Sequence, residues 1–120
     1  MKQYTDAVQT VRLIDLGFPA PKSVSRLSLD LDMDTIPTFA YSIGELIEML
    51  PKTIESEIWV GEDKGKIGVW GLLIDTAATE YGWDISYDRE FSAYLYREGA
   101  SELIDALFEM VIKLKEEEII

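Results

Sequence analysis

The segment Lys66-Ile67-Gly68-Val69-Trp70-Gly71-Leu72-Leu73-Ile74-Asp75 predicts the longest strand of the chain. Successive side chains of a strand point to opposite faces, and both sets are apolar here. One set is Ile67, Val69 and Leu73, and the other is Trp70, Leu72 and Ile74. This pattern is typical of a central strand that is covered on both sides, or of a strand that keeps one face for a partner. We therefore expect residues 66–75 to lie inside a sheet.

Further strands are expected before and after this segment. Alternating, β-branched and aromatic residues predict them at 27–33, 57–60, 81–87 and 91–96. In the last of these, Phe91, Ala93 and Leu95 fit one face, which leaves Tyr94 and Tyr96 on the other. Strands that follow one another directly along a chain favour an antiparallel meander.

Apolar periodicity predicts three helices, at residues 4–16, 42–50 and 101–118. In the first, we expect a buried stripe of Tyr4, Val8, Val11 and Ile14, widened by Leu13 and Leu16. The second begins with the capping-box pair Ser42 and Glu45 and ends before Pro51. The third begins after Ser101 as N-cap and buries Leu103, Leu107, Met110, Val111 and Leu114.

Together these elements predict an α+β fold, with an antiparallel sheet of four or five strands and three helices packed mainly on one face. A length of 120 residues is typical of one domain, so we expect residues 1–120 to form a single domain. The neighbouring acids Glu116, Glu117 and Glu118 repel one another, and residues 116–120 are therefore expected to fray.

Composition excludes several kinds of chemistry. The chain contains no histidine and no cysteine, so its own residues cannot build a Ser-His-Asp or Cys-His catalytic system, a His- or Cys-ligated zinc site or a disulfide. Its 23 acidic and 11 basic residues give a net charge of −12, which disfavours direct binding to nucleic acid and to anionic membranes. The N-terminal residues lack the apolar region of a signal peptide, and no apolar run is long enough to span a membrane. We therefore expect a cytoplasmic protein.

The run from Asp30 to Asp34 is the candidate for a metal site. An EF-hand loop counted from Asp30 needs Gly and Glu where this chain has Thr35 and Tyr41, so the calcium loop is excluded. On a strand, Asp30, Asp32 and Asp34 would share one face. A solvated face is the preferred interpretation, and weak binding of a hard divalent ion is the alternative. We predict no cofactor.

Aromatic residues concentrate in the predicted strands. We select as candidates for partner binding Trp70, Trp83, Tyr87, Tyr94 and Tyr96, because Trp and Tyr are enriched where proteins bind one another. Two interpretations stay open. The rings either pack in the core with their polar atoms reaching solvent, or form an exposed sheet face for a partner or a second copy.

Two segments of the chain are similar to segments of other small proteins. Residues 42–52 form a Ser-capped, Leu-rich helix that ends at Pro51-Lys52 before a β region, and residues 102–114 form a Leu-Ile-Asp-Ala helix that closes the chain. In these segments the chain resembles small uncharacterised proteins of Bacteroides-type bacteria and of their phage-like or mobile elements. The resemblance implies a bacterial or phage setting. It implies no known activity and no functional residue.

The sequence leaves the function unknown and three hypotheses open. The missing catalytic residue types favour a non-enzymatic domain that binds another protein or forms a homodimer. The first alternative is an acidic DNA mimic that inhibits a DNA-binding protein by presenting carboxylates in place of phosphates. The second is a small enzyme that uses carboxylates, which would need converging acids in a pocket.

Overall fold

The computed structural model of the chain describes residues 1–25, 38–76, 82–89 and 93–120. Within these ranges the chain forms three helices, a four-stranded antiparallel sheet and a separate two-stranded pair. The predicted α+β class is therefore confirmed. The strand predicted at 27–33, together with Tyr81 and Phe91, lies outside the described residues.

The four strands of the sheet follow one another in chain order as a meander. They are β3 (Thr53–Glu57), β4 (Ile67–Asp75), β5 (Trp83–Arg89) and β6 (Ala93–Ala100). As predicted, β4 is an interior strand, since it pairs with β3 on one side and β5 on the other. The prediction of a strand at 57–60 is wrong. The strand ends at Glu57, and only Ile58 continues the backbone pairing, with Gly65 and Lys66, before the loop.

A bulge in β6 changes which of its side chains share a face. Ser86 pairs with Arg97 and Asp88 pairs with Tyr94, so Leu95 and Tyr96 together lie opposite the single residue Tyr87. Both pack against the core, whereas Tyr94 is exposed. The predicted separation of Leu95 from Tyr96 is therefore wrong, because strict alternation holds only where the ladder has no extra residue.

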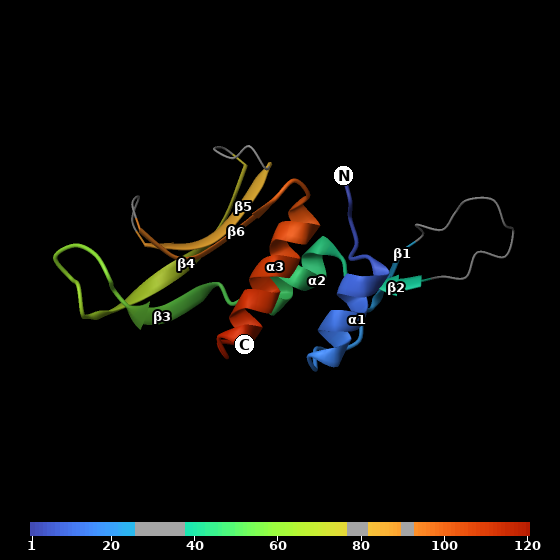
Figure 1. The fold of residues 1–120 in the computed structure, drawn as a ribbon, viewed down its shortest axis with the longest axis horizontal. Coiled ribbons are helices and arrows are strands. Elements are labelled where there is room, and N and C mark those ends of the chain that lie inside the picture. The colour runs from blue at the N-terminus through green and yellow to red at the C-terminus, as the bar shows by residue number, and fades with distance from the viewer. Residues whose placement is uncertain (26–37, 77–81, 90–92) are drawn as a thin grey trace, which may run out of the picture.

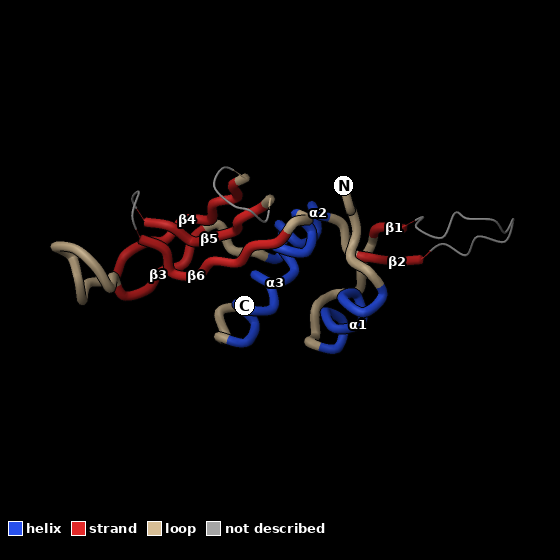
Figure 2. Tube along the Cα trace, turned by 45° about the horizontal axis from the view of Figure 1, so that its top comes forward, coloured by secondary structure: helices blue, strands red, loops and turns tan. Residues whose placement is uncertain are grey.

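The central helix α3 (Leu103–Glu116) lies between the sheet and the remaining helices, α1 (Ala7–Asp15) and α2 (Ile43–Met49), as Figure 1 shows. It is buried on nearly all sides, since nine of its residues are covered: Leu103, Ile104, Ala106, Leu107, Phe108, Met110, Val111, Ile112 and Leu114. This explains why its apolar residues extend beyond one stripe. Figure 2 gives the same order of layers, with the short pair β1 (Ser23–Ser25) and β2 (Thr38–Ala40) beside α1.

Helix α1 presents a different face to the core from the one predicted. Thr10 and Leu13 are its buried residues, whereas Val8, Val11 and Ile14 of the predicted stripe point to solvent. The reason is a buried polar contact. The hydroxyls of Thr5 and Thr10 lie 2.7 Å apart, and the Thr10 hydroxyl also donates to the carbonyl of Asp6. A threonine whose hydroxyl is satisfied in this way can be buried at low cost.

The ends of α3 also differ from expectation. Ser101 is not the N-cap; Glu102 takes that position, and its side chain accepts a hydrogen bond from the backbone nitrogen of Lys2. At the other end, Glu118 has a φ of 58°, and the backbone nitrogen of Ile119 donates to the carbonyl of Leu114 at 2.9 Å. This is a Schellman turn. Ile119 and Ile120 pack against the core in place of the expected frayed end.

The inner face of the sheet, which faces α3, is closely packed. Trp70, Ile85 and Tyr87 are fully buried there. The Trp70 indole donates to the carbonyl of Ser56 at 3.3 Å, and the Tyr87 hydroxyl donates to the carbonyl of Pro51 at 2.7 Å. Each ring therefore satisfies its polar atom within the core.

Candidate functional site

The side of the sheet turned away from α3, the outer sheet face, carries a row of uncovered apolar side chains along β4. Ile67 is 70% exposed, Val69 is 54% exposed and Leu73 is 43% exposed. They come from one strand and alternate with inward-facing residues, so the row spans about 20 Å, with Gly71 between Val69 and Leu73. Exposed apolar rows of this kind are typical of interaction surfaces.

Carboxylates flank the row on both sides. On β3, Glu57 and Glu55 are the cross-strand partners of Ile67 and Val69. Asp75 lies on β4 itself, at the end of the row. On the other side the register of β4, β5 and β6 places on the outer face Asp84, Asp88 and one arginine, Arg97. Among the described residues, the outer sheet face therefore combines an apolar centre with a rim of five carboxylates and a single guanidinium.

The one guanidinium of this face is held by its neighbours. Arg97 donates from Nε to Oδ2 of Asp84 at 3.0 Å, and its Cζ lies 5.8 Å from the ring centroid of Tyr94. The hydrogen bond to Asp84 raises the pKa of Arg97, so the pair stays charged. The Tyr94 carbonyl in turn accepts a hydrogen bond of 3.2 Å from the indole of Trp59, which is half exposed. These contacts fix the β6 side of the face.

Asp88 provides a carboxylate oxygen that the described residues leave unsatisfied. Its Oδ1 is buried and has no hydrogen-bond partner within the described part of the chain. Asp88 pairs with Gly71 on β4, which has no side chain, and with Tyr94 on β6. A buried acceptor without a donor costs free energy, so this oxygen makes an unfavourable contribution to the stability of the fold.

The structure separates the five aromatic residues predicted to bind a partner. Trp70 and Tyr87 are fully buried, so they belong to the core and are not available to a partner. Trp83 and Tyr96 are half-buried and pack against the same core. Tyr94 alone among the five is exposed on the outer sheet face. For most of these rings, the core interpretation is the one that the structure supports.

The sequence left open that residues 66–75 keep one face for a partner, but the residues selected as binding candidates were aromatic and did not include the aliphatic row. The signal was present, because residues 66–75 are apolar on both faces and a sheet with helices on one side can cover only one of them. The candidates for partner binding were chosen because Trp and Tyr are common at interfaces. That criterion was misleading here, since large rings fill cores as readily as interfaces.

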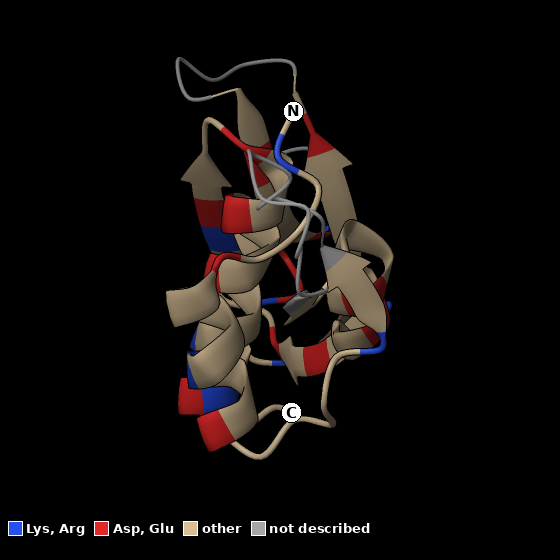
Figure 3. Cartoon of the chain, turned by 90° about the vertical axis from the view of Figure 1, so that its right-hand side faces the viewer, with Lys and Arg blue, Asp and Glu red and all other residues tan. Residues whose placement is uncertain are grey.

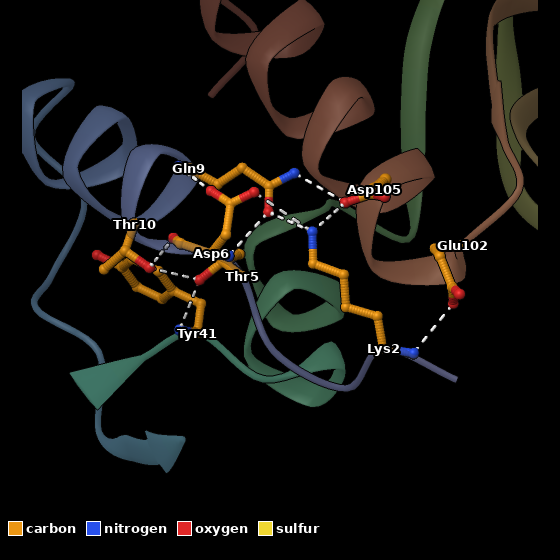
Figure 4. Close-up of polar contacts among 8 residues, drawn as sticks. All are labelled: Lys2, Thr5, Asp6, Gln9, Thr10, Tyr41, Glu102 and Asp105. Carbon is orange, nitrogen blue, oxygen red and sulfur yellow. Dashed lines mark hydrogen bonds and ion pairs between the residues drawn. The ribbon is translucent and has the colours of Figure 1, made fainter. Parts of the chain in front are cut away.

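A second polar cluster joins the N-terminal segment to the start of α3 (Figure 4). Lys2 Nζ lies 2.8 Å from Oδ1 of Asp105, and the Gln9 amide donates to the same oxygen at 2.8 Å. Burial alone would raise the pKa of Asp105, but these hydrogen bonds lower it. Every polar group of this cluster is engaged with another, so it serves to fix α1 against α3.

A shallow groove of about 400 Å³ lies between the segment after α1 and helix α2. It is lined chiefly by Phe18, Pro19, Tyr41, Glu45 and Met49. Its polar groups already serve the fold. The Tyr41 hydroxyl donates to the Pro19 carbonyl, and Glu45 accepts from the backbone nitrogens of Lys22 and Ser42 at 3.0 and 3.2 Å. Burial alone would raise the pKa of Glu45, but these hydrogen bonds outweigh burial, and the pKa is lowered.

The remaining sequence expectations concern metals and membranes. Asp30, Asp32 and Asp34 lie outside the described residues. Within the described ranges, no three acidic side chains are grouped so that they could hold a metal ion. No helix in the described part of the chain is long and apolar enough to cross a membrane.

Comparison of the chain with protein families, with curated proteins and with solved structures found no match. The function must therefore be inferred from the chemistry of the surface itself.

Proposed function

We propose that this protein is a protein-interaction module whose outer sheet face binds an amphipathic segment of another protein that is both apolar and basic. The observation that carries this proposal is the apolar row Ile67, Val69 and Leu73 with carboxylates on both sides. An apolar strip on the partner would cover the row, and lysine or arginine side chains beside it would meet the acidic rim.

The charge of the face selects the partner. Two copies that met through this face would bring five carboxylates against five, with one arginine on each side. Like charges at an interface are costly, so a basic partner is preferred over a second copy.

The shape of the face suggests a helical segment. A row of about 20 Å matches a helix of about 14 residues. Helices commonly cover sheets in α+β proteins, and α3 does so on the inner face of this sheet. The proposed role is recognition and needs no catalytic group. We also propose a bacterial or phage setting, supported by the resemblance at residues 42–52 and 102–114, and a cytoplasmic location.

The alternative of a DNA mimic has less support. Mimicry of a DNA backbone needs carboxylates in continuous rows, whereas acids in the described part of the chain are spread over helices and strands alike (Figure 3). On the outer sheet face the apolar row divides the carboxylates of β3 from those of β5. This division favours an amphipathic protein segment over a DNA-binding protein.

Fluorescence anisotropy with a labelled amphipathic peptide of leucine and lysine at helical spacing would test the proposal. We expect an affinity that weakens as salt rises. Val69→Ser should lower this affinity by about tenfold, because it removes roughly half of the free energy gained by burying a valine side chain. The matched control is Val11→Ser on α1, because Val11 and Val69 are 55% and 54% exposed. Equal binding by a peptide with glutamate in place of lysine would contradict the proposal, as would a Val11→Ser effect equal to that of Val69→Ser.

A further inference from the structure

The carboxylates on the two sides of the apolar row differ in what they are still able to bind. On β3, which lies at the edge of the sheet, Glu55 and Glu57 are both exposed. Neither carboxylate has an ion-pair partner within the described part of the chain. A lysine or arginine side chain of a bound molecule can therefore pair with them without displacing a group of the protein itself.

On β5, by contrast, a guanidinium of the protein already occupies the carboxylate. Arg97 donates from both Nε and Nη2 to Oδ2 of Asp84. The Asp84 side chain is only 15% exposed, although it lies on the outer sheet face. The hydrogen bond to Asp84, and in addition the charge of Asp88, raise the pKa of Arg97. One positive charge thus offsets part of the negative charge of both β5 carboxylates.

Neighbouring aromatic groups keep Arg97 on this side of the face. Its Cζ lies 5.8 Å from the ring centroid of Tyr94, whose carbonyl accepts a hydrogen bond from the indole of Trp59. A basic side chain that approached β5 would meet this guanidinium, and like charges at an interface are costly. Among the described residues, the acids that flank the row are therefore open to a cation on β3 and obstructed on β5.

We propose that the bound segment is a helix with basic residues on only one flank of its apolar stripe, and that this flank lies over Glu55 and Glu57. The flank that faces Arg97 is uncharged or acidic. This partner is a narrower class than the basic amphipathic segment of the proposed function, on which it rests. Turning a helix end to end on the row moves its basic flank to the other side. The position of that flank therefore fixes the direction in which the helix lies along β4.

Two peptides of identical composition test this direction. Both carry leucines along one stripe; one has lysines on the first flank and glutamines on the second, and the other has these positions exchanged. A nitroxide spin label is attached to an N-terminal cysteine of each peptide, because the protein has no cysteine that could take up the label. In NMR spectra of the isotopically labelled protein, one peptide should broaden the amide of Ile67 more strongly, and the other should broaden that of Leu73.

The double variant Glu55→Gln with Glu57→Gln should remove this preference. Without open acids on β3, each peptide should broaden both ends of the row to a similar extent. Both side chains are exposed, so the fold should be retained, which the spectrum without peptide checks. The matched control is Glu48→Gln with Glu109→Gln, which removes two exposed acids of α2 and α3 and the same charge. It should leave the two directions unchanged.

Arg97→Gln tests the other side of the face. Loss of the guanidinium uncovers Asp84 and Asp88, so a peptide with lysines on both flanks should bind about two- to fivefold more tightly, the effect of one exposed ion pair. Arg12→Gln on α1 removes the same charge from a half-exposed side chain away from the sheet, and should raise the affinity by less than about twofold. Equal gains for the two variants would mean that Arg97 does not obstruct a basic flank.

The outcomes separate the one-sided partner from the proposed function. If both peptides shift the amides of β4 but broaden the same end, or both ends equally, the one-sided partner is wrong and the outer sheet face remains the binding surface. If neither peptide shifts any amide of β4, the proposed function is wrong, and the one-sided partner with it. Opposite ends for the two peptides, lost only in the β3 double variant, would support both.

Discussion

The two faces of β4 carry similar side chains in very different surroundings. On the inner face, Trp70 is fully buried in the core and Leu72 packs against the same core. On the outer face, Ile67 and Val69 are more than half exposed beside Glu57 and Glu55 of β3. Apolar character therefore does not distinguish a core face from a binding face. The neighbouring strands make the distinction, because they supply apolar partners on one side of the sheet and acids on the other.

The largest expected effect separates the two faces by stability. Trp70→Ala should lower the free energy of unfolding by about 3–5 kcal/mol, because it leaves a cavity under α3 and removes the bond to Ser56. Val69→Ala, next to it in sequence but on the outer face, should change it by no more than about 0.5 kcal/mol. Urea denaturation of both variants measures the difference. Similar losses for the two would mean that the outer face is also covered in the isolated protein.

A smaller effect is expected at the two glycines of β4. A Cβ added to Gly68 would lie 2.7 Å from Cδ1 of Ile58 on the inner side, so Gly68→Ala should cost about 1–3 kcal/mol. At Gly71 the nearest atom would be 4.0 Å away, and Gly71→Ala should be neutral or stabilising by up to about 1 kcal/mol. Thermal unfolding of the two variants distinguishes them. Equal melting temperatures would show that Ile58 does not pack on Gly68.

The smallest expected effect depends on pH and concerns Glu98 on the inner face of β6, opposite Ile85. Burial and the nearby Glu109 raise the pKa of Glu98 above 4.5. The folded state thus holds this proton more tightly, and stability is lost as pH rises from about 4.5 through the folded pKa. Glu98→Gln should therefore stabilise the protein at pH 7, by less than about 1 kcal/mol, and have little effect at pH 4.

The matched control for this pH effect is Glu55→Gln on the outer face, where Glu55 is exposed beside Val69. It should change the free energy of unfolding by only a few tenths of a kcal/mol at either pH. Denaturant titrations at the two pH values measure both variants. If Glu98→Gln destabilised the protein at pH 7, its carboxylate would have to be a stabilising partner of Lys113, and the proposed sign would be wrong.

Local rules predicted much of the fold. The capping box of Ser42 and Glu45 is present as expected, with the backbone nitrogen of Glu45 donating to the Ser42 hydroxyl at 3.2 Å. The alternation of β5 placed Ile85 and Tyr87 correctly on one face. The interior position of β4 followed from its apolar length. These features depend on neighbours along the chain, so periodicity and capping preferences were sufficient.

The features that were missed depend on contacts between distant residues. The buried side of α1 is decided by Thr5, whose hydroxyl meets Thr10 and accepts from the backbone nitrogen of Tyr41 at 3.0 Å. A count of apolar residues cannot detect that pairing. The bulge at Leu95 and Tyr96 adds an unpaired residue that strict alternation does not allow. The candidate site was overlooked for a similar reason, because only the register across β3, β4 and β5 shows that Glu55 lies beside Val69 and that Asp88 and Asp84 lie opposite Gly71 and Asp75.

The most direct test of the central claim is a titration of the isotopically labelled protein with the leucine–lysine peptide, followed by amide chemical shifts. The account predicts that the largest shifts fall on residues 67–73 of β4 and on the neighbouring residues 84–88 of β5, with Asp88 among them. The amides of α1 should stay nearly unchanged. Shifts concentrated on α1 or on the groove beside α2, with none on β4, would contradict the assignment of the outer sheet face as the binding surface.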